Sequence, residues 1–176
     1  MGGASALGGI AYHTVDDARG LPEAQALRAA IRPGDLYHAR TGLVCLENTH
    51  NLAGGVAATA AQLQPLTQVA REAGLPVHLD GARLFQACAA LDQQVSQYAS
   101  QVDSLMLCLS KGLGAPLGAL LLGSRAFIQR ARSMRKMLGG GMRQTGYLAA
   151  MGRVALLEGP AQLVEDVRHA RQLAAA

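Results

Sequence analysis

The sequence predicts an α/β protein whose mainly parallel β-sheet is flanked by helices. Between residues 43 and 111, short apolar runs of strand type alternate with segments whose apolar residues recur at helical spacing. This alternation of strand and helix favours a parallel sheet with right-handed crossovers. Half of the 176 residues are hydrophobic and only 3% are aromatic. Small aliphatic residues would therefore fill the core, and alanine and glycine would let helices lie close to the sheet.

Local signals define the elements of the first half. Pro22 suits the first turn of a helix, and Arg32-Pro33-Gly34 would end that helix. Gly74 is a natural C-cap for a later helix. We expect strands over residues 9–14, 43–46 and 76–80, and helices over residues 21–31 and 64–73.

The second half should contain two more strands and several helices. We expect helices over residues 84–91 and 95–101, a strand leading to Lys111, and a second buried strand over residues 117–122. Ser124 can cap the next helix, which the glycines of residues 138–141 would break. Glu158-Gly-Pro160 should then separate two further helices.

The formal net charge of +4 comes almost wholly from arginine, because the only lysines are Lys111 and Lys136. Arginines gather between residues 125 and 143, but no aromatic residues interleave with them as stacking platforms for bases. A solvated helix face or a subunit contact is therefore favoured over a nucleic-acid interface.

The cysteines indicate a reducing compartment. Cys45, Cys88 and Cys108 are odd in number, widely spaced and set in apolar surroundings, which is typical of reduced core residues. No apolar run reaches membrane-spanning length, and the start of the chain lacks a signal-peptide pattern. We expect a cytoplasmic protein with no membrane partner and no metal site.

Lys111 ends an apolar run, and Gly112, Gly114 and Pro116 leave little side-chain bulk beside it. Poor solvation at such a place disfavours the charged ammonium, and a neutral amine can attack a carbonyl. The alternative is that Lys111 reaches from a strand end into water without a chemical role.

Two other predicted strands end in polar clusters, which run from Glu47 to His50 and from Asp80 to Arg83. Ligands bind outside the carboxyl ends of strands in open α/β sheets, so both clusters and Lys111 should surround one crevice. Pyridoxal phosphate needs a lysine for a Schiff base and an acid that keeps its ring nitrogen protonated. Asp80 could instead cap the next helix or pair with Arg83, and His50 could belong to a solvated turn.

Four motifs carry a resemblance to a known family. They are Leu46-Glu-Asn-Thr-His-Asn51, His78-Leu-Asp-Gly-Ala-Arg83, Cys108-Leu-Ser-Lys-Gly-Leu-Gly-Ala-Pro-Leu-Gly118 and Arg135-Lys-Met-Leu-Gly-Gly-Gly-Met-Arg-Gln144. In this order they resemble the low-specificity L-threonine aldolases, pyridoxal-phosphate enzymes of the beta-eliminating lyase group with the aspartate aminotransferase-like fold (fold type I). The resemblance implies a lyase that splits L-threonine, L-allo-threonine or related β-hydroxy-α-amino acids into glycine and an aldehyde.

The resemblance also implies roles for single residues. Lys111 would form the Schiff base with the cofactor, and Asp80 would pair with the pyridine nitrogen. Arg83 would lie near the ring oxygen or the substrate carboxylate, and Ser110 would help to hold the phosphate. His50 would face the substrate hydroxyl as a candidate catalytic residue.

The fourth motif contains Lys136 and Arg143, which by resemblance border the substrate. The family's amino-terminal phosphate loop and its carboxyl-terminal small domain have no counterpart in this sequence. We therefore expect a large domain truncated at both ends, with a partial cofactor-binding domain over residues 1–158. Residues 159–176 would begin the helix that leads to the small domain.

Two functions follow from these observations. The first is a threonine aldolase that works as a homodimer or homotetramer on a small amino acid when complete. The second is a catalytically incompetent fragment or remnant of such an enzyme, which acts, if at all, by associating with other subunits.

Overall fold

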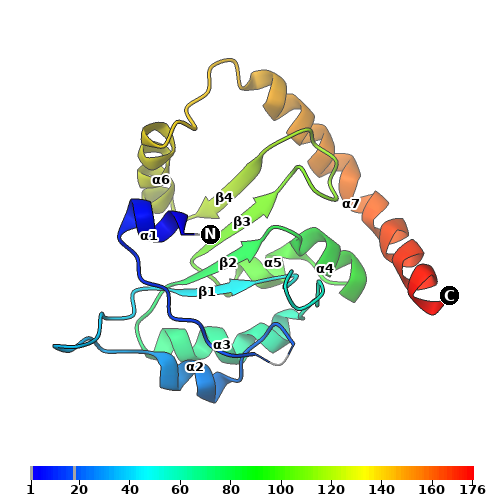
Figure 1. Cartoon of the computed structure of the whole chain (residues 1–176). Coiled ribbons are helices and arrows are strands. Elements are labelled where there is room, and N and C mark those ends of the chain that lie inside the picture. Colours follow the sequence, from blue (N-terminus) through cyan, green and yellow to red (C-terminus); the bar gives the residue numbers. More distant parts are fainter. Residues whose placement is uncertain (1, 18) are drawn as a thin grey trace.

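Four strands form one sheet in the order β1-β2-β3-β4 in the computed structural model, which describes residues 2–17 and 19–176 (Figure 1). The strands are β1 (Val44–Glu47), β2 (Val77–Gly81), β3 (Ser104–Cys108) and β4 (Ala119–Gly123). β1, β2 and β3 pair in parallel, and β4 pairs antiparallel to β3. The predicted mainly parallel sheet is thus confirmed.

The helices connect and flank these strands. They are α1 (Gly3–Gly8), α2 (Ala24–Ala30), α3 (Ala60–Glu72), α4 (Leu84–Leu91), α5 (Val95–Ala99), α6 (Arg125–Met137) and α7 (Gly146–Ala175). Two crossovers, one through α3 and one through α4 and α5, join the parallel strands as expected. Figure 1 shows α7 running past the edge at which β1, β2 and β3 end.

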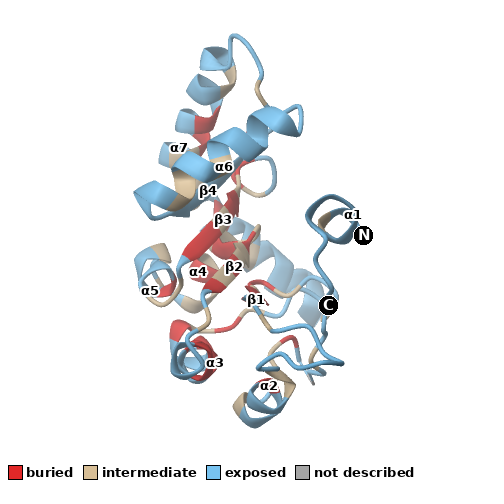
Figure 2. Cartoon of the chain, turned by 90° about the vertical axis from the view of Figure 1, so that its left-hand side faces the viewer, coloured by how far each residue is buried: buried red, intermediate tan, exposed pale blue. Residues whose placement is uncertain are grey.

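The main core lies between the sheet and α3, α4 and α5, which lie on one side of it (Figure 2). Every second residue of β1, β2 and β3 points into this core, as Val77 and Leu79 of β2 do. Leu63 and Leu66 of α3 and Leu84 of α4 meet them and are at most 2% exposed. Burial of one such side chain contributes roughly 1.5–3 kcal/mol, so this face of the sheet holds most of the fold together.

Side-chain caps fix where two helices begin. Thr59 and Gln62 form a reciprocal capping box, so α3 begins at Ala60, four residues before the predicted start. The Ser124 hydroxyl accepts a hydrogen bond from the Phe127 N–H at the start of α6, as predicted.

Two expectations about strands are wrong. Residues 9–17 form no strand, and a short helix, α1, precedes them. The segment is almost wholly exposed and has no strand beside it to complete its hydrogen bonds. The strand expected over residues 117–122 exists as β4 at one edge of the sheet, but all five of its residues are exposed because neither hydrophobic core cluster extends over β4.

The helix break expected at Glu158-Gly-Pro160 is also wrong, because α7 continues through Pro160. Gly159 serves a packing purpose, since a Cβ there would lie 3.0 Å from the Leu113 backbone. Leu163 of the next turn is 1% exposed, so tertiary packing stabilises the helix beyond the proline. The domain boundary expected after residue 158 falls inside this helix.

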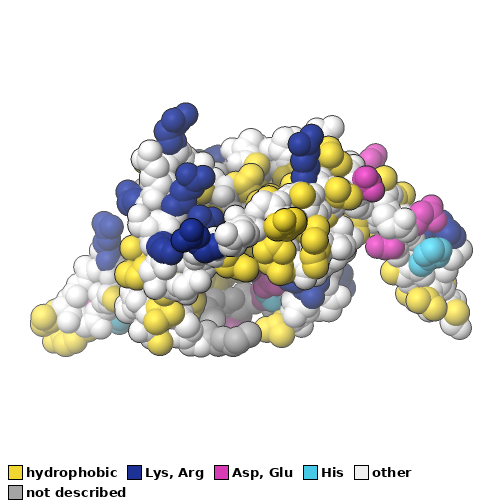
Figure 3. Space-filling view, turned by 90° about the horizontal axis from the view of Figure 1, so that it is seen from above, with side chains coloured by type: hydrophobic (Ala, Val, Ile, Leu, Met, Phe, Trp, Pro, Cys, Tyr) yellow, Lys and Arg dark blue, Asp and Glu magenta, His cyan; other side chains and the backbone are white. Residues whose placement is uncertain are grey.

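Hydrophobic side chains remain exposed on the far side of the molecule from the core. Figure 3 shows them gathered beside a group of Lys and Arg side chains. On β4, α6 and α7 they are Leu120, Leu121, Leu122, Met134, Met137, Tyr147, Met151, Val154 and Leu157. Among the described residues, no helix is long and apolar enough to cross a membrane.

The buried Tyr98 of α5 provides a test of the core. Its hydroxyl donates to the Ala58 carbonyl oxygen at 2.9 Å and lies 2.6 Å from Gln93 Oε1. Burial, and to a lesser degree the charge of an ionised Cys88, raises the pKa of Tyr98 to about 12. The folded chain thus holds this proton more tightly than the unfolded chain, and stability that is present below pH 10 is lost as the pH rises towards 12.

We predict that Tyr98→Phe lowers the free energy of unfolding by about 1 kcal/mol at pH 7, because the buried hydrogen bond of the hydroxyl is lost. The variant should also lose less stability than the wild type between pH 9 and pH 11. Urea titrations across this range measure both effects, with Tyr147→Phe at an exposed position as control. Equal stability of Tyr98→Phe and wild type would contradict the prediction.

Candidate active site at the carboxyl ends of the parallel strands

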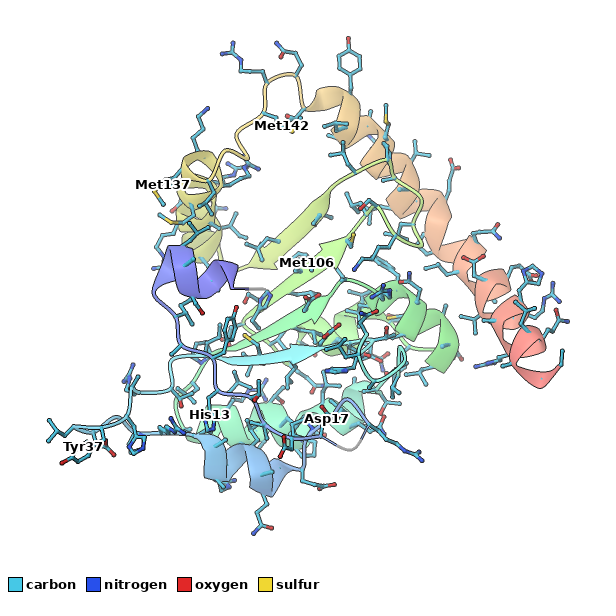
Figure 4. The ribbon with its side chains drawn as sticks, viewed as in Figure 1. His13, Asp17, Tyr37, Met106, Met137 and Met142 are labelled. Atoms are coloured by element: carbon cyan, nitrogen blue, oxygen red, sulfur yellow. The ribbon has the colours of Figure 1, made fainter. Side chains whose placement is uncertain are left out.

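The polar segments that follow β1, β2 and β3 meet at one edge of the sheet. Glu47 pairs with Asp80 in the strand register, and Asp80 pairs with Met106. The Asn48 N–H donates to the Asp80 carbonyl oxygen at 2.9 Å and so continues the pairing beyond β1. Figure 4 shows Met106 in the middle of the sheet, between β2 and β4.

Asp80 lies on the face of the sheet opposite the main core, which we call the open face. Its residues on β1, β2 and β3 are Cys45, Glu47, His78, Asp80, Ser104, Met106 and Cys108. The Asp80 carboxylate is half-buried and accepts a hydrogen bond from the Ala82 N–H at 3.0 Å. Among the described residues no ion pair to Asp80 is formed, Arg83 included. Its negative charge is therefore free to meet a cation on the open face.

His78 is the immediate neighbour of Asp80 on this face. Its Nδ1 lies 2.8 Å from the Ser104 hydroxyl on β3. Loss of hydration lowers the pKa of His78, and the nearby Asp80 carboxylate partly opposes this shift. A largely uncharged imidazole next to Asp80 leaves the carboxylate without a competing cation.

The sequence predicts that all three cysteines are core residues, and this prediction is wrong for two of them. All three are free thiols, and Cys88 is buried, but Cys45 is exposed and Cys108 is half-buried. Cys45 and Cys108 occupy open-face positions of β1 and β3, because side chains alternate between the two faces of a strand.

Lys111 lies in the loop between β3 and β4, at the same edge of the sheet. The loop is closed by hydrogen bonds from the Leu109 N–H to the Gly118 oxygen and from the Ala115 N–H to the Leu109 oxygen. Lys111 is exposed, so the expected exclusion of water from its amine is wrong for this chain. Its amine is open to solvent and to any ligand that approaches the edge.

The loop that carries Lys111, residues 109–118, which we call the lysine loop, packs its apolar side against α7. Leu109, Leu113 and Ala115 form a second hydrophobic cluster with Ala155 and Leu163 of that helix. These contacts fix the base of the loop while its polar residues remain at the surface.

Ser110 and Arg83 flank the lysine and the carboxylate. Ser110 is exposed, and its hydroxyl lies 3.3 Å from the Cys108 thiol. Arg83 is half-buried at the N-cap of α4, two residues beyond the end of β2. The structure brings both to the same edge as Asp80 and Lys111.

His50 follows β1 in a tight turn that positions its imidazole ring. The ring Nδ1 accepts a hydrogen bond from the Ala53 N–H at 3.2 Å, and Nε2 lies 3.9 Å from Glu47 Oε2. The neutral ring therefore carries its proton on Nε2. Gly20 closes the turn from the other side, because a Cβ there would lie 2.6 Å from the His50 Cβ.

The last two sequence-predicted residues lie elsewhere. Lys136 is in the last turn of α6, and Arg143 is in the loop before α7. Their neighbours Met137 and Met142 lie at the left and the top of Figure 4, away from the edge at which β1, β2 and β3 end. The chain thus gathers five of the seven predicted residues at one edge of the sheet.

Sequence reasoning missed Gln86 of α4, whose carboxamide lies between the loops that carry Arg83 and Lys111. No sequence signal identifies it, because the contact joins residues that only the tertiary structure brings together. The described residues contain no group of three His, Cys, Asp or Glu side chains placed to hold a metal ion.

The chain belongs to the beta-eliminating lyase family, whose pattern matches residues 1–176. It is 46% identical over 176 residues to "Probable low-specificity L-threonine aldolase 2" of Arabidopsis thaliana, covering 98% of this chain and 50% of that protein. It is 43% identical over 174 residues to the low specificity L-threonine aldolase of Escherichia coli (strain K12), covering 98% and 51%. The chain thus spans about half the length of the curated relatives it matches.

Solved structures share the fold. The threonine aldolase of Leishmania major superposes with a TM-score of 0.71 at 24% identity, covering 89% of this chain and 46% of that one. At this identity the likeness concerns the fold, and it agrees with the predicted aspartate aminotransferase-like architecture.

The open face yields a prediction of pH dependence. Because the pKa of His78 is lowered in the folded chain, the unfolded chain binds more protons below pH 6.5. Stability present above pH 6.5 should therefore fall as the pH drops, and His78→Gln should weaken this fall. Urea titrations at pH 7.5 and pH 5.5 measure the difference, with the exposed His169→Gln as control. The same pH dependence in His78→Gln and wild type would contradict the assignment.

Proposed function

We propose that the complete protein is a pyridoxal-phosphate-dependent lyase that cleaves L-threonine, L-allo-threonine or related β-hydroxy-α-amino acids into glycine and an aldehyde. One observation carries the proposal: a half-buried carboxylate without a cation partner among the described residues, Asp80, lies at the same sheet edge as the exposed amine of Lys111. The relatives named low-specificity L-threonine aldolases support the choice of reaction.

The residues at this edge fit the cofactor. Lys111 would supply the amine that binds the cofactor's carbonyl carbon, and Asp80 would hold a proton on the ring nitrogen. Ser110 would contact the phosphate, and Arg83 would bind a carboxylate or the ring oxygen by charge-assisted hydrogen bonds. When bound, pyridoxal phosphate supplies an electron sink for the electron pair released as the Cα–Cβ bond breaks.

His50 would orient the substrate. Its Nδ1 is engaged by the Ala53 N–H, so its Nε2–H is the group that can donate to a substrate hydroxyl. To accept the hydroxyl proton, the ring would have to transfer its Nε2 proton elsewhere, and Glu47 at 3.9 Å is the nearest carboxylate in the turn. Lys136 and Arg143 would join the substrate site only if α6 and the following loop met this edge from another subunit.

We further propose that the complete protein has a small domain beyond residue 158 and assembles as a homodimer or homotetramer. The lengths of the relatives and the exposed hydrophobic side chains of α7 support both ideas.

A second candidate function is non-catalytic association of this chain with a full-length subunit. The exposed side chains of β4 and α7, such as Leu121, Tyr147 and Met151, favour it. Co-expression with a tagged complete relative distinguishes the two, because association alone would give a complex whose lyase activity does not depend on Lys111 of this chain.

We predict that Lys111→Ala in the complete protein abolishes the lysine adduct that borohydride traps after addition of pyridoxal phosphate. Peptide mapping of the reduced protein locates the adduct, and Lys136→Ala is the matched control because it removes the only other lysine of this segment. An adduct found on Lys136 in the wild type would overturn the assignment.

We predict that Asp80→Asn leaves the trapped adduct in place but lowers turnover of threonine. Loss of a charge-assisted contact of about 2 kcal/mol corresponds to a rate reduction of about thirtyfold. Acetaldehyde release under saturating threonine measures the effect, and near-normal turnover would show that another group keeps the ring nitrogen protonated.

A further inference from the structure

We propose that Gln86 is a positioning residue that holds the Lys111–Gly112 peptide group and so fixes the point from which the Lys111 side chain extends. The inference rests on the proposed function, because it concerns the lysine assigned there as the anchor of the cofactor. Gln86 lies on α4, outside the four sequence motifs that carry the predicted site residues.

The Gln86 carboxamide bridges two loops of the site. With its oxygen towards Gly112, it accepts from the Gly112 N–H at 3.2 Å and donates to the Arg83 carbonyl oxygen at 3.2 Å. The opposite orientation would set oxygen against oxygen and N–H against N–H, so the carboxamide has one favourable orientation here. One side chain therefore joins the loop after β2 to the loop after β3.

The peptide group between Lys111 and Gly112 is held at both of its polar ends. Its N–H is paired with Gln86, and its carbonyl oxygen, on Lys111, accepts from the Gly114 N–H at 3.0 Å. Two hydrogen bonds on opposite sides of one planar group restrict its rotation. The backbone direction at Lys111 is thus set by α4 on one side and by the loop itself on the other.

The space around Gly112 leaves little freedom for another arrangement. A Cβ on Gly112 would lie 2.4 Å from the carboxamide atom of Gln86 that faces it and 2.6 Å from Leu163 Cδ2. Leu163 of α7 is 1% exposed, so it cannot readily move aside. Gly112 thus lies between Gln86 of α4 and Leu163 of α7, and of these two side chains only Gln86 can form a hydrogen bond with it.

Such a restraint matters because the Lys111 side chain itself is exposed. Only its backbone can be held in the free chain, and misplacement of a reacting group by about 1 Å can cost about a hundredfold in rate. The Arg83 carbonyl, also bonded by the Ala87 N–H at 3.2 Å, belongs to the first turn of α4. Gln86 therefore fixes the position of the Lys111 backbone relative to Arg83 and to the segment that carries Asp80.

The test uses the 176-residue chain and three substitutions of Gln86. Gln86→Met keeps the length of the side chain without its hydrogen bonds, and Gln86→Asn withdraws the carboxamide by one methylene. Gln86→Glu keeps an oxygen for the Gly112 N–H but loses the donor to the Arg83 carbonyl oxygen. Gln64→Met, at an exposed position of α3, is the matched control.

Amide hydrogen exchange, read residue by residue by NMR, gives the first measurement. In Gln86→Met and Gln86→Asn, exchange at Gly112 and Gly114 should be about tenfold faster than in the wild type. Exchange should be slower in Gln86→Glu than in these two variants, because the acceptor for the Gly112 N–H remains, and it should stay near the wild-type rate in Gln64→Met. Because Met and Glu both fill the space of Gln86, a role in packing alone would leave exchange near the wild-type rate in both variants. Faster exchange in Gln86→Met than in Gln86→Glu therefore separates hydrogen bonding from packing.

The second measurement is the rate at which pyridoxal phosphate modifies Lys111, trapped by borohydride and compared with Lys136 in the same sample. The ratio should fall several-fold in Gln86→Met and Gln86→Asn, and it should fall less in Gln86→Glu. Unchanged exchange at Gly112 in both weakened variants, or faster exchange with an unchanged ratio, overturns the inference. If even the wild type is not modified at Lys111, the proposed function fails, while the exchange rates still decide whether Gln86 holds the peptide.

Discussion

Parallel pairing of β1, β2 and β3 is the constraint on which the candidate site depends. Strands that run in the same direction end at the same edge, so the polar residues that follow each strand meet there. The register sets Glu47 beside Asp80, and the Asn48 N–H extends the pairing by one more bond to the Asp80 carbonyl. A slip of one residue in β2 would turn Asp80 into the core and Leu79 onto the open face.

Helices cover one face of the sheet but not the face that carries Asp80, and this difference determines the environment of the Asp80 carboxylate. On the core side, α3, α4 and α5 exclude water from alternate strand residues. On the open face, His78 and Asp80 are half-buried, and the lowered pKa of His78 keeps the imidazole largely uncharged at neutral pH. The carboxylate consequently keeps an uncompensated negative charge, which suits a cationic ring nitrogen.

The lysine loop depends on a different part of the fold. Its apolar residues lie against α7, whose Gly159 allows the helix backbone to approach Leu113 closely. Its backbone is tied to α4 through Gln86. Lys111 thus presents an exposed amine on a loop whose backbone is held in place. α7 supports this loop by packing, although it contributes no polar group to the site.

The sequence by itself determined the strands and most of the helices, because local periodicity, caps such as Ser124, and polar strand ends such as Asp80 and His50 are short-range signals. It also determined which chemical groups meet at the carboxyl edge, since that follows from parallel order alone. Only the tertiary structure decided that residues 9–17 form no strand, that β4 is an exposed edge and that α7 continues through Pro160. These outcomes depend on which neighbours each segment finds. No core cluster extends over β4, and burial of Leu163 stabilises α7 although Pro160 has no N–H to donate. The exposure of Lys111 and the bridge made by Gln86 likewise arise from contacts between residues far apart in the chain, for which the sequence carries no local signal.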